Sequence, residues 1–310
     1  MNAAVGHAPV VAAVARRLAM AGVPSPDVDA RWLVDHVVEV AGDPVGCGAA
    51  LLDGLVARRC RREPVQQIIG RTWFRRLELA CAPGVFIPRP ETEVVAGLAI
   101  AAAADAVRAA TPSDALDAAG DAPPRAPIRI VEPCTGTGAI ALSIGVEVAG
   151  VQIVAGDVDP AAVELATTNL ARVHEGRAGT RLAPDSSVRI VSGELLAGVD
   201  PTWRGSVAVL VANPPYLPDA DRVGWEPEVA DHDPDRALVG GEDGHEVVDA
   251  LLVAAGHWLR PGGTVIVEID ERRGDDARRA ARAAGLIDVD VRPDLTGADR
   301  ALVARRPEPA

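Results

Sequence analysis

The sequence contains no lysine, and each of its 31 basic residues is an arginine. Aromatic residues make up only 3% of the chain, which has a single tyrosine, Tyr216. The formal net charge is −13, and this surplus of negative charge disfavours any function that needs a broad phosphate-neutralising surface. Arginine without lysine, together with abundant alanine, is typical of a biased base composition of the gene and indicates no function by itself.

Cysteine is also scarce, and long apolar runs are missing. The four cysteines are Cys47, Cys60, Cys81 and Cys134. Their spacing fits neither a paired metal-ligand motif nor a disulfide framework, so we expect free thiols in a reducing compartment and no bound metal. No apolar run approaches the roughly 20 residues of a membrane span, and no signal-peptide pattern begins the chain. The sequence therefore predicts a cytoplasmic protein without a membrane partner.

The N-terminal part has the pattern of a small helical bundle. Hydrophobic residues make up 48% of the 310-residue chain, which is enough for one large domain and a smaller one. Three helices are expected between residues 8 and 61, with Ser25 as N-cap of the second and Gly42 at its end. We assign residues 1–70 to this domain. The dense arginines from Arg58 to Arg76 are interpreted as solvated faces of a helix and a hairpin.

The hydrophobic pattern then changes. Residues 71–111 predict a short hairpin and a connecting alanine-rich helix, and residues 112–127 predict a flexible loop. Over residues 128–310, apolar strands alternate with helices, which is typical of a doubly wound, mostly parallel sheet in an α/β protein. The expected strands are Ile128–Val131, Val151–Ala155, Val188–Val191, Val207–Ala212, Thr264–Ile269, Ile287–Val291 and Ala301–Ala304. The expected helices between them are 138–148, 160–173, 244–259 and 274–284.

Glycines follow the first of these strands directly. Gly136 and Gly138 let the backbone turn sharply and approach a ligand, and the next helix points its N-terminus at this loop. With Ala141 they satisfy the G-x-G-x-x-G/A fingerprint, and Asp157, about 20 residues further on, suits the hydroxyls of a ribose. An NAD-dependent enzyme and a methyltransferase that uses S-adenosylmethionine (SAM) both fit this pattern.

Two acids distinguish between these alternatives. Glu132 places a carboxylate before the glycines, where it would repel a pyrophosphate but attract an ammonium and a sulfonium. Glu194, after the third strand, is placed to accept a hydrogen bond from an adenine amine. With Asp157 and Asn213, these acids occupy the carboxyl ends of four successive strands. This arrangement favours SAM.

The tetrapeptide Asn213-Pro214-Pro215-Tyr216 gives the most specific signal. It follows the buried strand Val207–Ala212, whose pairing ends there because proline donates no backbone hydrogen bond. Asn213 therefore lies at the carboxyl end of a strand, where open α/β sheets bind ligands. Its side-chain oxygen and the carbonyl oxygen of Pro214 form two acceptors that suit a planar –NH2 group. The ring of Tyr216 can lie against the plane of such a group.

With these features the chain resembles a class I SAM-dependent methyltransferase, and more narrowly the protein-(glutamine-N(5)) methyltransferase family that modifies peptide chain release factors. The segments that carry the resemblance are Pro64–Gly70, Ile87–Glu93, Gly136–Gly138, Asn213–Tyr216, Glu226–Val229, Gly240–Gly244 and Pro261–Gly263. The resemblance covers nearly the whole chain from about residue 60. It implies that residues 1–70 bind the protein substrate and that residues 128–310 form the methyltransferase domain with a seven-stranded sheet.

The resemblance also implies roles for single residues at the cofactor. SAM, and its product S-adenosylhomocysteine, would be wrapped by Cys134, Thr135, Gly136, Thr137 and Gly138. Glu132 and Asp157 would contact the same cofactor, with Asp157 on the ribose. Glu194 and Leu195 would flank the adenine. The family usually has glycine where Cys134 stands and aspartate where Glu194 stands.

On the substrate side, the resemblance implies that a glutamine side chain is received by Asn213, Pro214, Pro215 and Tyr216. Asn213 would also lie near the cofactor, and Arg89 and Glu91 would border the substrate cleft. The implied reaction transfers a methyl group from SAM to the side-chain amide nitrogen of glutamine in the Gly-Gly-Gln motif of bacterial class 1 peptide chain release factors. No stable nucleic-acid partner is expected.

Other functions remain open on the sequence alone. A DNA or RNA methyltransferase acting on the adenine amine would use the same tetrapeptide, because adenine also presents a planar –NH2 group. The acidic charge and the scarcity of aromatics count against it. This adenine methyltransferase is the nearest alternative, and a glutamine methyltransferase of a ribosomal protein is a related one. A binding module that has lost its activity and an NAD-dependent dehydrogenase are less favoured, because the tetrapeptide and the acids fit neither.

Overall fold

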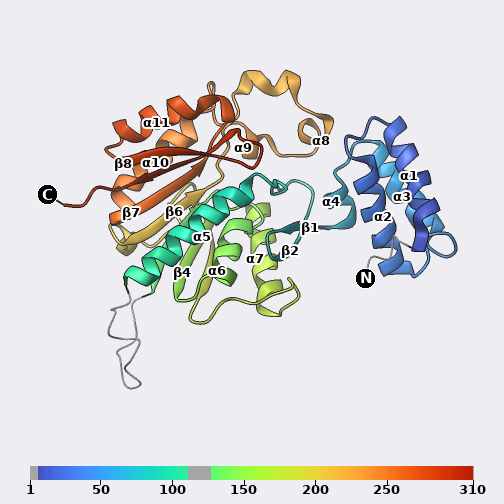
Figure 1. Cartoon of the computed structure of the whole chain (residues 1–310), viewed down its shortest axis with the longest axis horizontal. Helices are drawn as coiled ribbons and strands as arrows, with labels where there is room; N and C mark the ends of the chain where they lie inside the picture. Colours follow the sequence, from blue (N-terminus) through green and yellow to red (C-terminus); the bar gives the residue numbers. More distant parts are fainter. Residues whose placement is uncertain (1–5, 111–126, 310) are drawn as a thin grey trace. The chain divides into compact units, whose positions relative to one another are not determined.

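The computed structural model describes residues 6–110 and 127–309 (Figure 1). It divides into two compact units. Unit 1 comprises Met1–Thr72, Cys81–Gly84 and Gly224–Asp233, and unit 2 comprises Trp73–Ala80, Val85–Val223 and Pro234–Ala310. The loop predicted at 112–127 lies outside the described residues except for Pro127. No helix of the described segments combines the length and the apolar character that crossing a membrane requires.

Unit 1 is mainly helical. Its helices are α1 (Ala8–Met20), α2 (Pro26–Ala41), α3 (Ala49–Cys60), α4 (Val65–Ile69) and the short α8 (Pro227–Ala230). The sequence predicts the first three but not α4, because five residues are too few for a helical period to show. Ser25 precedes α2 as expected, yet its side chain makes no capping hydrogen bond, so Pro26 in the first turn is what supports this helix start.

Most arginines between Arg58 and Arg76 are ion-paired, so their interpretation as solvated faces is wrong for these residues. Arg59 is buried, with Nε 2.7 Å from Asp29 Oδ2 and Nη2 2.7 Å from Glu228 Oε1. Arg62 binds Glu228 as well, at 2.6 Å. In unit 2, Arg75 is paired in the same way with a glutamate of another element. The sequence pattern did not indicate these pairs, because the acids lie far from the arginines along the chain.

Unit 2 is built on a seven-stranded sheet with the order β5-β4-β3-β6-β7-β9-β8. The strands are β3 (Ile128–Pro133), β4 (Val151–Asp157), β5 (Ser187–Ser192), β6 (Val207–Ala212), β7 (Leu259–Glu268), β8 (Ile287–Pro293) and β9 (Asp299–Arg305). Strands β3 to β7 pair in parallel, and β9 is antiparallel to both of its neighbours. The predicted α/β class and mostly parallel sheet are confirmed.

Helices cover both faces of this sheet, as a doubly wound fold requires. One face packs against α5 (Thr92–Ala109), α6 (Ala139–Glu147) and α7 (Pro160–His174), and the other against α10 (Glu246–Trp258) and α11 (Gly274–Ala283) (Figure 1). Alternate residues of one strand serve the two faces: Ile130 lies in the first core and Val131 in the second. The first residue of α5, Thr92, is thereby fixed near β6 and β7.

The remaining elements are short. A hairpin of β1 (Arg71–Phe74) and β2 (Leu77–Ala80) precedes α5. Short helical segments are η3 (Pro201–Trp203), η4 (Asp219–Gly224), α9 (Asp235–Leu238) and η5 (Glu271–Arg273). Strand β7 begins at Leu259, earlier than predicted, because Leu259 pairs with Val207 before the irregular Pro261–Gly263 segment.

Candidate active site

The predicted site residues follow four strands that are neighbours in the sheet. Strands β5, β4, β3 and β6 lie side by side and parallel, so their carboxyl ends share one edge. The loops at this edge carry Glu194, Asp157, the segment Cys134–Gly138 and Asn213, in that spatial order. The structure therefore brings to one edge the four positions that the sequence indicates.

The glycine loop after β3 leaves room for a ligand. Cys134, Gly136 and Gly138 all have left-handed backbone, with φ of +59°, +55° and +84°. A Cβ added at Gly136 would meet no atom within 4 Å, whereas one at Gly138 would lie 3.2 Å from Leu142 Cδ1. Gly138 thus allows close packing of α6, and Gly136 faces open space. Left-handed backbone costs a non-glycine residue about 1–2 kcal/mol, which is the physical reason for a glycine preference at position 134.

The buried side chain of Glu132 holds this loop in place by hydrogen bonds. Its Oε2 accepts hydrogen bonds from Thr135 Oγ1 and from the backbone N–H of Ala141, both at 2.8 Å. Burial raises the pKa of Glu132 to about 8, against the effect of these two bonds. Burial also raises the pKa of the Cys134 thiol to about 12, so this thiol is neutral. A contact of Glu132 with a cofactor stays a prediction.

Asp157 joins the end of β4 to the same loop. Its Oδ2 accepts from the backbone N–H of Gly136 and its Oδ1 from that of Asp159, both at 2.9 Å. Burial raises the pKa of Asp157. Each carboxylate oxygen keeps a further lone pair for a ribose hydroxyl. Beyond β5, Glu194 is exposed, and Leu195 takes a left-handed φ of +50°.

The tetrapeptide is held by two residues that the sequence analysis missed, Thr92 and Glu268. Asn213 Nδ2 donates to Thr92 Oγ1 at 3.2 Å, and the hydroxyl of Tyr216 donates to Glu268 Oε1 at 3.1 Å. Over the described part of the chain, no hydrogen bond reaches Asn213 Oδ1 or the carbonyl oxygen of Pro214. The two predicted acceptors are therefore free.

Glu268 ends β7 and is almost completely buried. Burial raises its pKa to about 7, while hydrogen bonding from Thr92 and Tyr216 and the charge of Arg300 act in the opposite direction. Within the described residues, its Oε2 has no hydrogen-bond partner. One sequence signal could have revealed it: Glu268 is the only charged residue in the apolar run Thr264–Ile269.

The backbone of the tetrapeptide also rests on a glycine loop. A Cβ at Gly240 would lie 2.5 Å from the Pro215 carbonyl oxygen, and one at Gly244 would lie 2.4 Å from that of Tyr216. Leu217 N–H donates to Leu238 at 2.9 Å just beyond the motif. Only glycine fits at these two positions, which explains the Gly240–Gly244 segment of the sequence.

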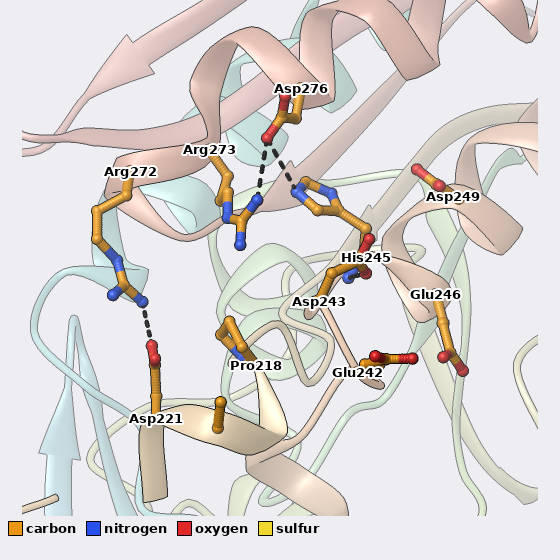
Figure 2. Close-up of a pocket in the computed structure, with 11 residues that line it drawn as sticks. Pro218, Asp221, Glu242, Asp243, His245, Glu246, Asp249, Arg272, Arg273 and Asp276 are labelled. Atoms are coloured by element: carbon orange, nitrogen blue, oxygen red, sulfur yellow. Dashed lines mark hydrogen bonds and ion pairs between the residues drawn. The ribbon is translucent and has the colours of Figure 1, made fainter. Parts of the chain in front are cut away.

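A hollow of about 900 Å³ opens beside the residues after the tetrapeptide (Figure 2). Its lining is Pro218, Ala220, Asp221, Glu242, Asp243, His245, Glu246, Asp249, Arg272, Arg273 and Asp276. Figure 2 shows Arg272 paired with Asp221, while Arg273 and His245 both approach Asp276. None of the predicted site residues lines this hollow. The described residues contain no group of three or more histidine, cysteine or acidic side chains suited to a metal ion.

Of the other predicted residues, Arg89 and Glu91 stand immediately before α5. The Arg89 guanidinium lies 4.9 Å from the centre of the Phe86 ring. The negative charge of Glu91 contributes to the raised pKa of Glu268. Glu91 directly precedes Thr92, which contacts the tetrapeptide, and the Arg89 carbonyl oxygen accepts from the Thr92 N–H at 3.1 Å. Contact of Arg89 and Glu91 with a substrate stays a prediction.

The strand order, the antiparallel β9 and the motif at the strand edge define a class I methyltransferase. A comparison with models of known protein families finds no match. Curated release factor glutamine methyltransferases, in contrast, are similar over nearly the whole chain. That of Streptomyces coelicolor is 39% identical over 308 residues, covering 96% of this chain and 98% of that protein. That of Mycolicibacterium smegmatis is 36% identical over 304 residues, covering 96% of each. The chain belongs to the release factor glutamine methyltransferase family, which confirms the resemblance.

Solved structures that are similar to this chain include the following two methyltransferases. The protein-(glutamine-N5) methyltransferase (release factor-specific) from Alicyclobacillus acidocaldarius is 23% identical, with 74% of this chain and 100% of that chain covered and a TM-score of 0.38. The ribosomal protein L11 methylase from Lactobacillus delbrueckii is 19% identical, with 73% and 84% covered and a TM-score of 0.43.

Proposed function

We propose that this enzyme methylates the side-chain amide nitrogen of a glutamine in a class 1 peptide chain release factor, in its Gly-Gly-Gln motif. The observation that carries the proposal is the pair of free acceptors, Asn213 Oδ1 and the Pro214 carbonyl oxygen, at the edge of the sheet. The names of the curated relatives support the choice of a release factor over a ribosomal protein or an adenine.

The chemistry of the neighbouring edge fits SAM as methyl donor. Burial raises the pKa values of Glu132 and Asp157, and the negative charge of Asp157 adds to the effect on Glu132. A ligand that carries an ammonium and a sulfonium relieves this unfavourable charge, whereas a pyrophosphate would worsen it. When bound, SAM supplies a methyl group made electrophilic by its sulfonium. The residues that would hold it are Glu132, Cys134, Thr135, Gly136, Thr137, Gly138, Asp157, Glu194, Leu195 and Asn213.

The tetrapeptide compensates for the low nucleophilicity of the glutamine amide nitrogen. A carboxamide nitrogen attacks poorly because its lone pair is delocalised into the carbonyl group. Asn213 Oδ1 and the Pro214 carbonyl oxygen accept its two hydrogens and draw electron density onto the nitrogen, while Pro215 and the ring of Tyr216 bound the amide plane. Fixed acceptors of this kind need no reorganisation during the reaction. Alignment of the reacting groups lowers the barrier by up to about 7–11 kcal/mol.

The protein substrate is expected to use further parts of the chain. We assign its binding to the N-terminal helical domain, residues 1–70, and to Arg89 and Glu91 before α5. Neither assignment requires a nucleic-acid partner, and we place the reaction in the cytoplasm.

The test is a methylation assay with the full chain, radiolabelled SAM and a recombinant class 1 release factor, followed by mapping of the label by mass spectrometry. We expect one labelled glutamine. Asn213→Ala should lower turnover on the order of 10²–10³-fold, because one of two polarising acceptors is lost. Its affinity for SAM, measured by calorimetry, should stay largely intact, because the other residues that hold the cofactor are unaltered. Label on adenine in DNA or RNA instead, or full turnover in the variant, would overturn the proposal.

A further inference from the structure

Four side chains from three segments of the chain form one polar network at the tetrapeptide. Asn213 follows β6, Thr92 begins α5, Glu268 ends β7, and Tyr216 lies in the loop after Asn213. Asn213 Nδ2 donates to Thr92 Oγ1 at 3.2 Å, and the Tyr216 hydroxyl donates to Glu268 Oε1 at 3.1 Å. Hydrogen bonding from Thr92 also acts to lower the pKa of Glu268, against the effect of burial. Thr92 is 2% exposed and Glu268 is 1% exposed, so water does not compete for these contacts. The proposed reaction uses only Asn213 and Tyr216 of this network.

The direction of each hydrogen bond in the network follows from proton counting. An ionised carboxylate only accepts hydrogen bonds, so the single hydrogen of the Thr92 hydroxyl turns toward Glu268. The hydroxyl oxygen then has only lone pairs to offer Asn213, which must present its –NH2 end to it. The oxygen end of the Asn213 amide consequently points away from Thr92 and remains free. This argument fixes the orientation of an amide whose nitrogen and oxygen have nearly the same shape.

We propose that Glu268, acting through Thr92, is a positioning residue that selects which end of the Asn213 amide faces the substrate. The inference rests on the proposed function, because it explains how the acceptor for the glutamine –NH2 group is set. Glu268 itself touches neither the substrate nor the reacting atoms. Without it, the Thr92 hydrogen can turn to Asn213, and the amide then presents a donor to a group that has only hydrogens to give.

Protonation of Glu268 has the same consequence as its removal. The groups that face it are Thr92 and Glu91 from the start of α5, Tyr216 from the motif loop and Arg300 from β9. Arg300 is itself paired with Asp294 at 3.1 Å and with Glu271 at 3.5 Å. Burial raises the pKa of Glu268 to about 7 despite the opposing Arg300 charge. Because the ionised form orients Asn213, turnover should rise with pH through this value and fall below it.

The experiment compares three substitutions in the full chain with release factor and SAM. Glu268→Gln keeps the shape but supplies an –NH2 group that can donate to Thr92. Thr92→Val removes the hydroxyl, and Thr92→Ser keeps it. Glu164→Gln, at an exposed position of α7, is the matched control for removal of a carboxylate. Each protein is measured for kcat and KM across pH 5.5–9, for SAM affinity by calorimetry and for its melting temperature.

We expect Glu268→Gln and Thr92→Val to lower kcat on the order of 10²-fold, as misplacement of one catalytic group does. KM for the release factor should change far less than kcat, because the other contacts of a protein substrate do not depend on the amide orientation, and SAM affinity should remain unchanged. The fall of kcat below neutral pH should vanish in both variants and persist in Thr92→Ser, which keeps most of the turnover. A merely structural role would not remove this limb of the pH profile.

Several results would overturn the inference. One is a Glu268→Gln variant with the kcat and the pH profile of the unaltered enzyme, and another is an equal loss in Thr92→Ser and Thr92→Val. If the melting temperature of Glu268→Gln is lowered, the comparison of Thr92→Val with Thr92→Ser still tests the inference. Failure of the proposed function is distinguishable, because then the unaltered enzyme methylates no release factor. If it does methylate one, and Asn213→Ala does not, unaffected Glu268 and Thr92 variants refute only this inference.

Discussion

Single carboxyl groups at the strand edge are buried away from water, which disfavours their charged form. Burial raises the pKa of Glu132 to about 8, far above its ordinary value of 4.5, and the charge of Asp157 adds to the effect. The folded protein therefore favours the neutral form of Glu132, and its contribution to stability is complete below pH 4.5. That contribution is lost as the pH rises toward 8, which is the opposite of what a salt-bridged acid does.

Substitution of Glu132 tests the direction of this change in stability with pH. Glu132→Gln keeps an oxygen for the bonds from Thr135 and Ala141 but carries no charge. Its free energy of unfolding should therefore exceed that of the unaltered protein by an amount that grows from pH 4.5 to about pH 8. Glu132→Ala leaves both donors unsatisfied and should cost about 2–3 kcal/mol below pH 4.5, and less as the pH rises toward 8. Urea unfolding followed by circular dichroism measures both. A Glu132→Gln protein that becomes relatively less stable with rising pH would contradict the assignment.

The sequence could identify some site residues and not others for a physical reason. Asn213 to Tyr216 are consecutive, and the glycines and Asp157 end strands, so pattern and spacing suffice to find them. Thr92 meets Asn213 across 121 positions, and Glu268 meets Tyr216 across 52. These partners are set by the packing of α5 and β7 on the sheet, which no local pattern shows. The sequence predicts Glu132 at the strand edge of the sheet. Its hydrogen bonds from Thr135 and Ala141 depend on the folded shape of the glycine loop, so the sequence does not show them.

Between elements, the tetrapeptide depends on a second loop for its shape. The Gly240–Gly244 segment packs against the backbone of Pro215 and Tyr216 so closely that a side chain cannot be inserted. The hydrogen bond from Gly240 N–H to the Leu217 carbonyl oxygen, at 3.0 Å, fixes the two segments in register. The rigid acceptors proposed for the substrate therefore require both the end of β6 and this loop.

Gly244→Ala should displace the tetrapeptide. The new Cβ would lie 2.4 Å from the Tyr216 carbonyl oxygen, and the φ of +82° is unfavourable to alanine. We expect a fall in kcat on the order of 10²-fold with unchanged SAM affinity, because a small displacement disturbs only the aligned groups. The assay is glutamine methylation beside SAM calorimetry.

Gly150→Ala is the matched control, since Gly150 has a φ of +74° but nothing within 4 Å of its added Cβ. It carries the backbone strain of about 1–2 kcal/mol without the collision. Equal loss of turnover in the two variants would show that strain alone, and not contact with the tetrapeptide, is responsible.

The elements themselves were largely predictable because buried strands form apolar runs. All seven strands of the sheet and the helices α6, α7, α10 and α11 lie close to their predicted positions. The ends of β5, β8 and β9 were not predicted, because pairing with neighbours extends these strands into polar residues such as Ser187 and Asp299. Helix α4 gave no pattern at all, since its five residues complete little more than one turn.

For the whole molecule, compact units do not coincide with continuous stretches of sequence. Residues 224–233 belong to the helical unit 1, although they follow the methyltransferase motif by only a few positions. Their acids neutralise arginines of α3, a link that division of the chain at residue 70 could not include. The net charge of −13 thus coexists with a buried cation, Arg59, which is enclosed by Asp29 and Glu228.

Glu228 should therefore stabilise unit 1 far more than its neighbour Glu226. Burial works against the charge of Glu228, but hydrogen bonds from Arg62 and Arg59 outweigh it and lower its pKa, so its contribution holds above pH 4.5 and is lost in acid. Glu228→Ala leaves Arg59 with one carboxylate fewer and should cost on the order of 3 kcal/mol. Glu226, 69% exposed and 3.0 Å from Arg62, is the control, with an expected loss of less than about 1 kcal/mol. Hydrogen exchange of peptides from α1 to α3 at pH 7 measures the stability of unit 1 in both variants. Equal protection of these peptides in the two variants would contradict the larger contribution of Glu228.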